Sequence, residues 1–200
     1  IARIKSRMES NMTGSGHTVA MLSAMAQFSP SSYYSDILRG YQYYEFIEKA
    51  DRDFDSMKEM LAENLKRTAA LIFTKENLTV SFTAEDDGLE LLQKPMTEFV
   101  AKLAQLQGKD AVRTFRPVKE KTAYTSSSQV QYVARCGNYR KAGYEYTGAL
   151  KVLKIIFSYD YLWLNVRVKG GAYGCMSGFY RNGDTYMVSY RDPNLAETNA

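Results

Sequence analysis

The stretch of sequence that decides the fold is residues 172–191, AYGCMSGFYRNGDTYMVSYR. Two strand-forming runs, 172–179 and 185–191, lie on either side of the dipeptide Asn182-Gly183. Asparagine and glycine both tolerate a positive φ, so this pair between two such runs is a strong hairpin signal. The stretch therefore predicts two antiparallel strands joined by a tight turn.

The segments around this hairpin predict the other elements of a C-terminal part. Residues 146–163 are strongly apolar and predict a helix that leads into a turn at 167–171. A strand is expected over 130–136, and residues 192–194 predict the cap of a short last helix.

The N-terminal part is predicted to be mainly helical, because apolar residues recur at helical spacing in four places. A strand is expected over 78–83, where apolar and polar residues alternate, and another helix over 89–103, beginning near Pro95. The residues that define the first four helices are Ile1, Ile4, Met8 and Met12; Val19, Leu22 and Met25; Tyr34, Leu38, Tyr41 and Ile47; and Met57, Leu61, Leu65 and Ala69.

Residues 108–123 have little periodicity, many charges and a proline at 117. Such a segment is typical of a linker between compact parts. We therefore expect one part over 1–107, a linker over 108–123, and a second part over 124–200.

Composition places the chain among globular proteins. Of its 200 residues, 45% are hydrophobic and 24% are charged, which excludes disordered and fibrous chains. The longest apolar stretch, 149–168, is interrupted by four charged residues, so no membrane-spanning helix is expected. The chain begins with Ile1 instead of Met, inside a predicted helix, and carries no visible secretory leader. We expect a piece excised from a longer protein.

Charge and cysteine content narrow the class further. The net charge is +4, and basic residues occur at most in pairs, Lys66-Arg67 and Arg140-Lys141. Nucleic-acid binders usually cluster these residues, so this pattern argues against that function. The only two cysteines, Cys136 and Cys175, make no disulfide framework and are expected to be buried free thiols.

A metal centre within this chain is not expected. Catalytic zinc usually takes three protein ligands, commonly with two histidines, and His17 is the only histidine. His17 as a general base is an alternative, but a local packing or capping role at a helix start is favoured. The acidic run 85–87 lacks the spacing of a calcium loop and is interpreted as a solvated turn.

The chain has sixteen tyrosines, five of them within residues 33–44. Tyrosine combines a large ring with a polar tip and suits wet interfaces, so a peptide- or nucleic-acid-binding surface is one interpretation. The other, which we favour, is a helix packed half into a core, because aromatic residues at helical spacing normally pack.

The segment 165–174, NVRVKGGAYG, differs from these features. It is not a phosphate-binding loop, because its lysine precedes the glycines and no Ser or Thr follows. The turn at Gly170 and Gly171 would direct the guanidinium of Arg167 and the phenol of Tyr173 toward one region, where both could donate to carbonyl oxygens. Taken alone, the two residues are more simply explained as a surface arginine and a core tyrosine.

Together with other short motifs, this segment resembles the C-terminal half of the insulinase (pitrilysin-type) zinc peptidases, most closely their presequence protease branch. The resemblance covers nearly the whole chain. The motifs that carry it are residues 15–17 (SGH), 28–30 (FSP), 33–35 (YYS), 158–163 (SYDYLW), 167–174 (RVKGGAYG) and 186–194 (YMVSYRDPN).

The resemblance implies an α+β fold, with mixed, mainly antiparallel sheets packed on one face by helices. It places 1–107 at the end of the third of four related domains and 124–200 at the start of the fourth. The family carries zinc on an inverted H-x-x-E-H motif, which this chain lacks. The resemblance therefore implies that zinc is bound by the N-terminal half of the longer chain and that this piece alone has no catalytic residue and no activity.

The resemblance also implies roles and partners. Arg167 and Tyr173 correspond to the family's substrate-binding arginine and tyrosine, with Gly170 and Gly171 as the supporting turn. The partners would be unfolded peptide substrates, cut in a closed chamber, and the N-terminal half of the same chain, with no nucleic acid and no membrane. The location would be the cytoplasm of a bacterium or an organelle matrix.

Two alternatives from other classes stay open. One is an inactive scaffold or partner subunit of the same superfamily. The other is a peptide- or RNA-binding module that uses the tyrosine-rich helix, for which salt-sensitive RNA binding would be the sign.

Overall fold

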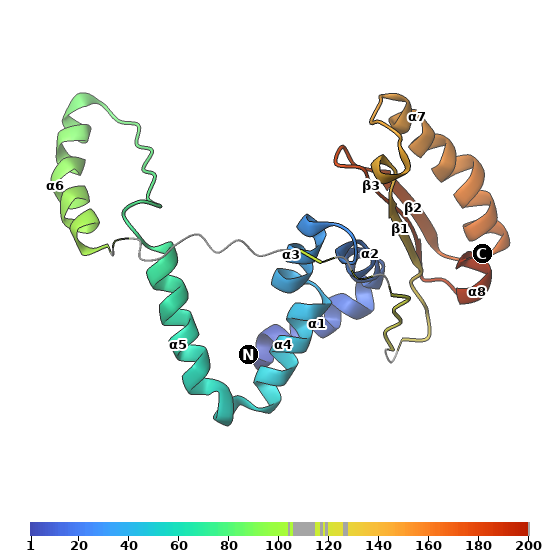
Figure 1. Cartoon of the computed structure of the whole chain (residues 1–200), viewed down its shortest axis with the longest axis horizontal. Helices are drawn as coiled ribbons and strands as arrows, with labels where there is room; N and C mark the ends of the chain where they lie inside the picture. Colours follow the sequence, from blue (N-terminus) through green and yellow to red (C-terminus); the bar gives the residue numbers. More distant parts are fainter. Residues whose placement is uncertain (104, 106–114, 117, 119, 126–127, 200) are drawn as a thin grey trace. The chain divides into compact units, whose positions relative to one another are not determined.

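The computed structural model describes residues 1–103, 105, 115–116, 118, 120–125 and 128–199 (Figure 1). The chain forms two compact units, one of Ile1–Arg52 with Phe115–Ala200 and one of Asp53–Thr114. The predicted linker at 108–123 falls mostly on residues 108–114, 117 and 119, which lie outside the described residues. The division at 108–123 into third and fourth domains therefore stays a prediction.

The first unit contains the predicted hairpin. Strands β2 (Gly174–Phe179) and β3 (Asp184–Tyr190) pair antiparallel, and β1 (Ala134–Asn138) pairs antiparallel with β3, so the strand order is β1-β3-β2. Gly183 in the turn has a φ of 96°, a conformation that glycine adopts without steric penalty. The strand expected at 130–136 is shifted toward the C-terminus, because residues 134–138 are the ones that align with β3.

Helices cover both faces of this sheet. On one face the thiol of Cys136 donates to the carbonyl oxygen of Met21 in α2 (Gly16–Ala26), at 3.7 Å. On the other face the hydroxyl of Ser177 lies 3.5 Å from that of Ser158, in the helical segment after α7 (Ala149–Ile156). Figure 1 shows α2 and α7 on opposite sides of the strands. The α+β class is confirmed, with α7 on one face and α2 on the other.

Four helices form the N-terminal portion of this unit. The third predicted helix is in fact two, because the chain breaks at Gly40. A Cβ at Gly40 would lie 2.0 Å from Oδ1 of Asp36, and Asp36 accepts hydrogen bonds from the Tyr41 backbone N–H and the Gln42 side chain, both at 2.9 Å. Asp36 thereby caps the helix that follows. The helices other than α2 are α1 (Ala2–Gly14), α3 (Pro30–Arg39) and α4 (Tyr41–Arg52).

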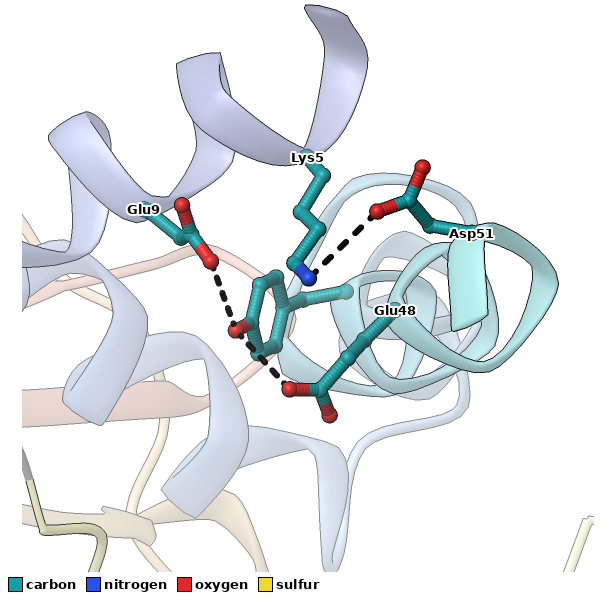
Figure 2. A network of polar contacts seen from close by, with 5 residues as sticks. Lys5, Glu9, Glu48 and Asp51 are labelled. Atoms are coloured by element: carbon teal, nitrogen blue, oxygen red, sulfur yellow. Dashed lines mark hydrogen bonds and ion pairs between the residues drawn. The ribbon is translucent and has the colours of Figure 1, made fainter. Parts of the chain in front are cut away.

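A polar network joins α1 to α4 (Figure 2). Lys5 of α1 forms an ion pair with Asp51 of α4 at 3.4 Å. The hydroxyl of Tyr44 donates to Glu9 at 3.3 Å and to Glu48 at 3.5 Å. Burial and the two carboxylates raise the pKa of Tyr44 to about 12. For Tyr44, the packing interpretation of the tyrosine-rich region is confirmed.

The corner between α1 and α2 is held against the sheet by aromatic side chains. The hydroxyl of Tyr132 donates to the carbonyl oxygen of Thr13 at 2.7 Å. The ring of His17 lies edge-on to that of Tyr190, with centres 4.9 Å apart. A Cβ at Gly16 would lie only 2.3 Å from the Tyr132 ring. His17 therefore packs, as expected, and burial lowers its pKa.

The apolar core of this unit is small and lies between the helices and the sheet. Its fully buried apolar residues come from α2, α4, the strands and the segments beside them. They are Met25, Ala26, Ile47, Ala50, Val133, Leu162, Ala172 and Val188. Leu38, predicted on an inward helix face, is 71% exposed, because the break at Gly40 lets Ser32 and Asp36 face inward instead.

The second unit consists of α5 (Phe54–Ile72) and α6 (Asp86–Lys102) with the segment between them. The strand predicted at 78–83 is not formed, because these residues pair with no other strand in the described part of the chain. The helix expected near Pro95 begins earlier, at Asp86, and contains Pro95. The predicted turn at 86–88 is therefore its first turn. Across the described residues, no helix has the length and apolar character that a bilayer crossing needs.

Candidate functional site

The candidate site begins where a long helical run ends. After α7 the chain continues as a π-helix, η2 (Phe157–Lys169), so the helix expected at 146–163 extends six residues further. The wider turn is visible where the Gly170 N–H donates to the carbonyl oxygen of Asn165 at 3.0 Å. Such widened turns occur frequently at functional sites. Arg167 therefore lies in the last turn of a helix and not in a loop.

Two glycines let the chain leave this helix. A Cβ at Gly170 would lie 2.7 Å from the carbonyl oxygen of Val166, and Gly171 has a φ of 79°. The side-chain amide of Asn194 donates to the Gly170 carbonyl oxygen at 2.5 Å. Any other residue at 170 or 171 would meet backbone atoms or backbone strain. The turn is thereby fixed from both sides.

The guanidinium of Arg167 lies against two aromatic rings. Its central carbon is 4.5 Å from the ring centre of Trp163 and 5.1 Å from that of Tyr173. Cation–π contacts of this kind orient an arginine and leave its in-plane N–H groups available. Arg167 is half-buried, and it forms no ion pair with any residue that the structure describes.

Tyr173 stands at the start of β2 with its ring turned outward. Its backbone N–H donates to the carbonyl oxygens of Tyr190 at 3.0 Å and Arg191 at 3.2 Å. The side chain is 65% exposed, so it is not a core tyrosine. Its ring centre lies 6.0 Å from that of Tyr190, and Tyr190 in turn contacts His17.

Arg167 and Tyr173 line the same open depression, of about 500 Å³. The structure thus brings together the two side chains that the sequence singled out. Sequence reasoning missed two others, Trp163 and Arg191. The spacing of Trp163, four residues before Arg167, was a usable signal for stacking on one helix face. The complete lining is Arg167, Val168, Gly171, Ala172, Tyr173 and Arg191.

The two cysteines are free and only half-buried, which is less than expected. Burial, with a contribution from the charge of Asp184, raises the pKa of Cys136 to about 12. Burial also raises the pKa of Cys175, although the positive charge of Arg167 opposes that shift. Neither thiol is poised as a nucleophile, which requires a lowered pKa.

The described residues do not fit a zinc centre. No three His, Cys, Asp or Glu side chains come together there in a way that could hold a metal ion. His17 has its Nε2 beside the Thr18 hydroxyl, at 3.3 Å, and its ring among tyrosines. The chemistry that this site offers is therefore hydrogen-bond donation from a guanidinium and a phenol.

Comparison with known families matches both ends of the chain. A family model described as "PreP C-terminal domain" matches residues 121–200. A second model, for a region associated with the C subfamily of the same peptidase family, matches residues 1–49. The first match includes the whole depression, and the second includes His17.

Curated relatives align along nearly the whole chain. "Protein HypA" of Clostridium perfringens is 36% identical over 197 residues, which is 97% of this chain and 20% of the relative. "Presequence protease 1, chloroplastic/mitochondrial" of Arabidopsis thaliana is 29% identical over 200 residues, 99% of this chain and 18% of the relative. "Presequence protease, mitochondrial" of Aspergillus oryzae is 26% identical over 195 residues, 94% of this chain and 19% of the relative.

The chain thus spans about a fifth of the length of the curated relatives it matches. The two family models match separate parts of the chain, and both are named for one peptidase branch. Named presequence proteases align across both parts. The chain therefore belongs to the presequence protease branch of the insulinase-type peptidases.

Proposed function

We propose that this chain is a region of the C-terminal half of a zinc-dependent endopeptidase that degrades unfolded peptides in a closed chamber. In this proposal Arg167 and Tyr173 bind the backbone of the substrate. The observation that carries it is the guanidinium of Arg167, which stacks on Trp163 and Tyr173 at the edge of an open depression and lacks an acidic partner among the described residues.

The chemistry of peptide hydrolysis explains why such donors are useful. When the amide carbon is attacked, negative charge develops on the carbonyl oxygen, and a preorganised donor there raises the rate by on the order of 10²-fold. Arg167 would hold one substrate carbonyl through its N–H groups, and the Tyr173 hydroxyl would donate to the reacting oxygen or an adjacent one. Stacking fixes the guanidinium before the substrate arrives, so little ordering is needed on binding.

The remaining parts of the proposal concern the longer protein. Its N-terminal half would hold the zinc and would be the main partner of this chain, so this chain alone would not cut peptides. Several relatives carry "mitochondrial" or "chloroplastic/mitochondrial" in their names. We accordingly propose the cytoplasm if the source is a bacterium, or an organelle matrix if it is a eukaryote.

The deciding experiment is peptide cleavage by the full-length protein, measured for the wild type, Arg167→Ala and Tyr173→Phe, with and without a zinc chelator. We expect chelator-sensitive cleavage whose kcat/KM falls by about tenfold or more in each variant. Arg181→Gln is a matched control, because Arg181 stacks on Tyr146 and does not line the depression.

Each other outcome rejects a defined part of the proposal. Normal cleavage by both variants would make Arg167 and Tyr173 structural residues. A full-length wild type that cleaves nothing would favour the inactive scaffold subunit. Zinc-dependent cleavage by the isolated 200-residue chain would show that its own residues hold the metal, and salt-sensitive RNA binding would favour the tyrosine-rich module.

A further inference from the structure

A second arginine, Arg191, lines the same depression as Arg167. Its guanidinium carbon lies 5.5 Å from the ring centre of Tyr190. The Tyr190 ring contacts the Tyr173 ring, on which Arg167 stacks. Each of two neighbouring tyrosine rings therefore supports one guanidinium beside a single hollow.

The backbone holds Arg191 in place. Its φ is 48°, and no other non-glycine residue in the described part of the chain has a positive φ. A non-glycine residue in this region of φ/ψ space is uncommon and persists where surrounding contacts determine it. Here the Arg191 carbonyl oxygen accepts from the Tyr173 N–H at 3.2 Å, and the next residue, Asp192, exchanges two backbone hydrogen bonds with Gln131.

The depression carries positive charge that the structure does not neutralise. None of the six residues that line it is acidic. Neither arginine forms an ion pair with any described residue, and the neighbouring carboxyl of Asp192 is fully buried, with one oxygen accepting from the Asn194 N–H at 2.8 Å. Two guanidiniums at one hollow, each with a planar fork of donors, match the geometry of a carboxylate.

We propose that Arg191 and Arg167 together bind a carboxylate of the peptide that occupies the depression. The inference rests on the proposed function in one respect, namely that this depression holds a peptide. It adds the chemical class that the site selects, because a donor pair for backbone carbonyls alone would not need a second fixed cation. The carboxylate would belong either to the C-terminus of the peptide or to a Glu or Asp side chain.

The test measures binding, so it does not depend on catalysis. Fluorescently labelled peptides are titrated with the full-length protein in the presence of a zinc chelator, and Kd is read from fluorescence anisotropy. One pair of peptides differs only in a free or amidated C-terminus, and a second, amidated pair differs only in an internal Glu or Gln. We expect at least one acidic member to bind about tenfold more tightly than its neutral twin.

Variants then assign this preference to Arg191. In Arg191→Gln the ratio of the two Kd values should fall toward one, whereas Arg191→Lys should keep part of it because the charge remains. Arg181→Gln, outside the depression, should keep the full ratio. The first peptide pair reports a terminal carboxylate and the second a side-chain carboxylate, so the source is read from the same experiment.

The inference fails in two ways. It is overturned if acidic and neutral twins bind the wild type equally, or if Arg191→Gln weakens both members of a pair to the same extent and leaves the ratio unchanged. Neither result touches the proposed function, which is judged by the cleavage activity of Arg167→Ala and Tyr173→Phe. Conversely, a chelator-insensitive or inactive protein with an intact, Arg191-dependent Kd ratio would reject the peptidase and keep the carboxylate site.

Discussion

The guanidinium carbon of Arg167 lies 4.5 Å from the centre of the Trp163 ring. Both residues belong to η2, and the tryptophan is 45% exposed, so the contact is not part of the buried core. An exposed tryptophan beside an arginine without an ion pair keeps the guanidinium in one orientation. The position of Arg167 thus depends on a residue that does not itself line the depression.

Replacing Trp163 should therefore affect substrate binding more than the chemical step. For Trp163→Leu in the full-length protein we expect KM to rise roughly two- to fivefold, which corresponds to the loss of an exposed cation–π contact, with kcat nearly unchanged. Trp163→Phe should lose less, because it retains a ring. Steady-state kinetics with one peptide check this, and a fall in kcat at constant KM would contradict the positioning role.

Two glycines at the α1–α2 corner make a matched pair. A Cβ at Gly16 would meet the Tyr132 ring at 2.3 Å, whereas nothing lies within 4 Å of a Cβ at Gly14. We expect Gly16→Ala to destabilise this corner by ~1–3 kcal/mol through overpacking, and Gly14→Ala to be neutral or slightly stabilising.

Hydrogen exchange of the full-length protein, read on peptides that cover residues 10–25, measures both changes. Adding Tyr132→Leu to Gly16→Ala should recover part of the lost protection, because the clashing ring is gone. Equal exchange in Gly16→Ala and Gly14→Ala would show that the ring moves aside without cost.

Asp36 should be important for the separation of α3 from α4. It is 2% exposed, and its carboxylate accepts from the Tyr41 N–H and the Gln42 amide. Asp36→Ala would leave a helix N-terminus without its acceptor, and we expect a loss of ~1–3 kcal/mol. Asp36→Asn should lose less, because an amide oxygen can still accept one of these bonds.

Asp55→Ala is the control for this change. The Asp55 side chain is 94% exposed and pairs with Lys58 at 3.2 Å, and exposed pairs of this kind contribute about 0.5 kcal/mol or less. Urea unfolding of the full-length protein, followed by tryptophan fluorescence, compares the three variants. The capping role is rejected if Asp36→Ala unfolds at the same urea concentration as Asp55→Ala.

The two thiols should differ in their reaction with iodoacetamide. The thiolate is the reactive form, and with a pKa of about 12 only roughly a thousandth of Cys136 is ionised at pH 9. Because burial raises this pKa, the reaction of Cys136 should keep accelerating well above pH 9, where an unfolded cysteine is already half ionised. Cys175, whose upward shift Arg167 opposes, should react faster.

Mass-spectrometric peptide mapping of the native full-length protein resolves both sites in one sample. Arg167→Gln should slow Cys175 while leaving Cys136 unchanged, which separates the charge of Arg167 from general accessibility. Equal rates for the two cysteines at pH 8 and pH 10 would show that burial does not control their ionisation.

Local sequence was sufficient for the elements whose signals are local. The Asn182-Gly183 hairpin, the helices of the N-terminal part and the glycine turn after Arg167 all follow from neighbouring residues and from the φ that each turn requires. The pattern around Arg167 and Tyr173 also pointed to two side chains that line one depression. The family followed from motifs that are spread along the whole chain.

Tertiary structure decided what depends on a partner far away in the sequence. Residues 78–83 alternate like a strand but remain unpaired in the described part of the chain, because a strand needs a neighbour to hydrogen-bond with. Asp36 faces inward and divides one predicted helix into two, since its acceptor atoms satisfy the start of the next. The convergence of Arg191 on the depression depends on the pairing of β2 with β3. No periodicity reveals such a placement, because it arises only when separate segments fold against one another.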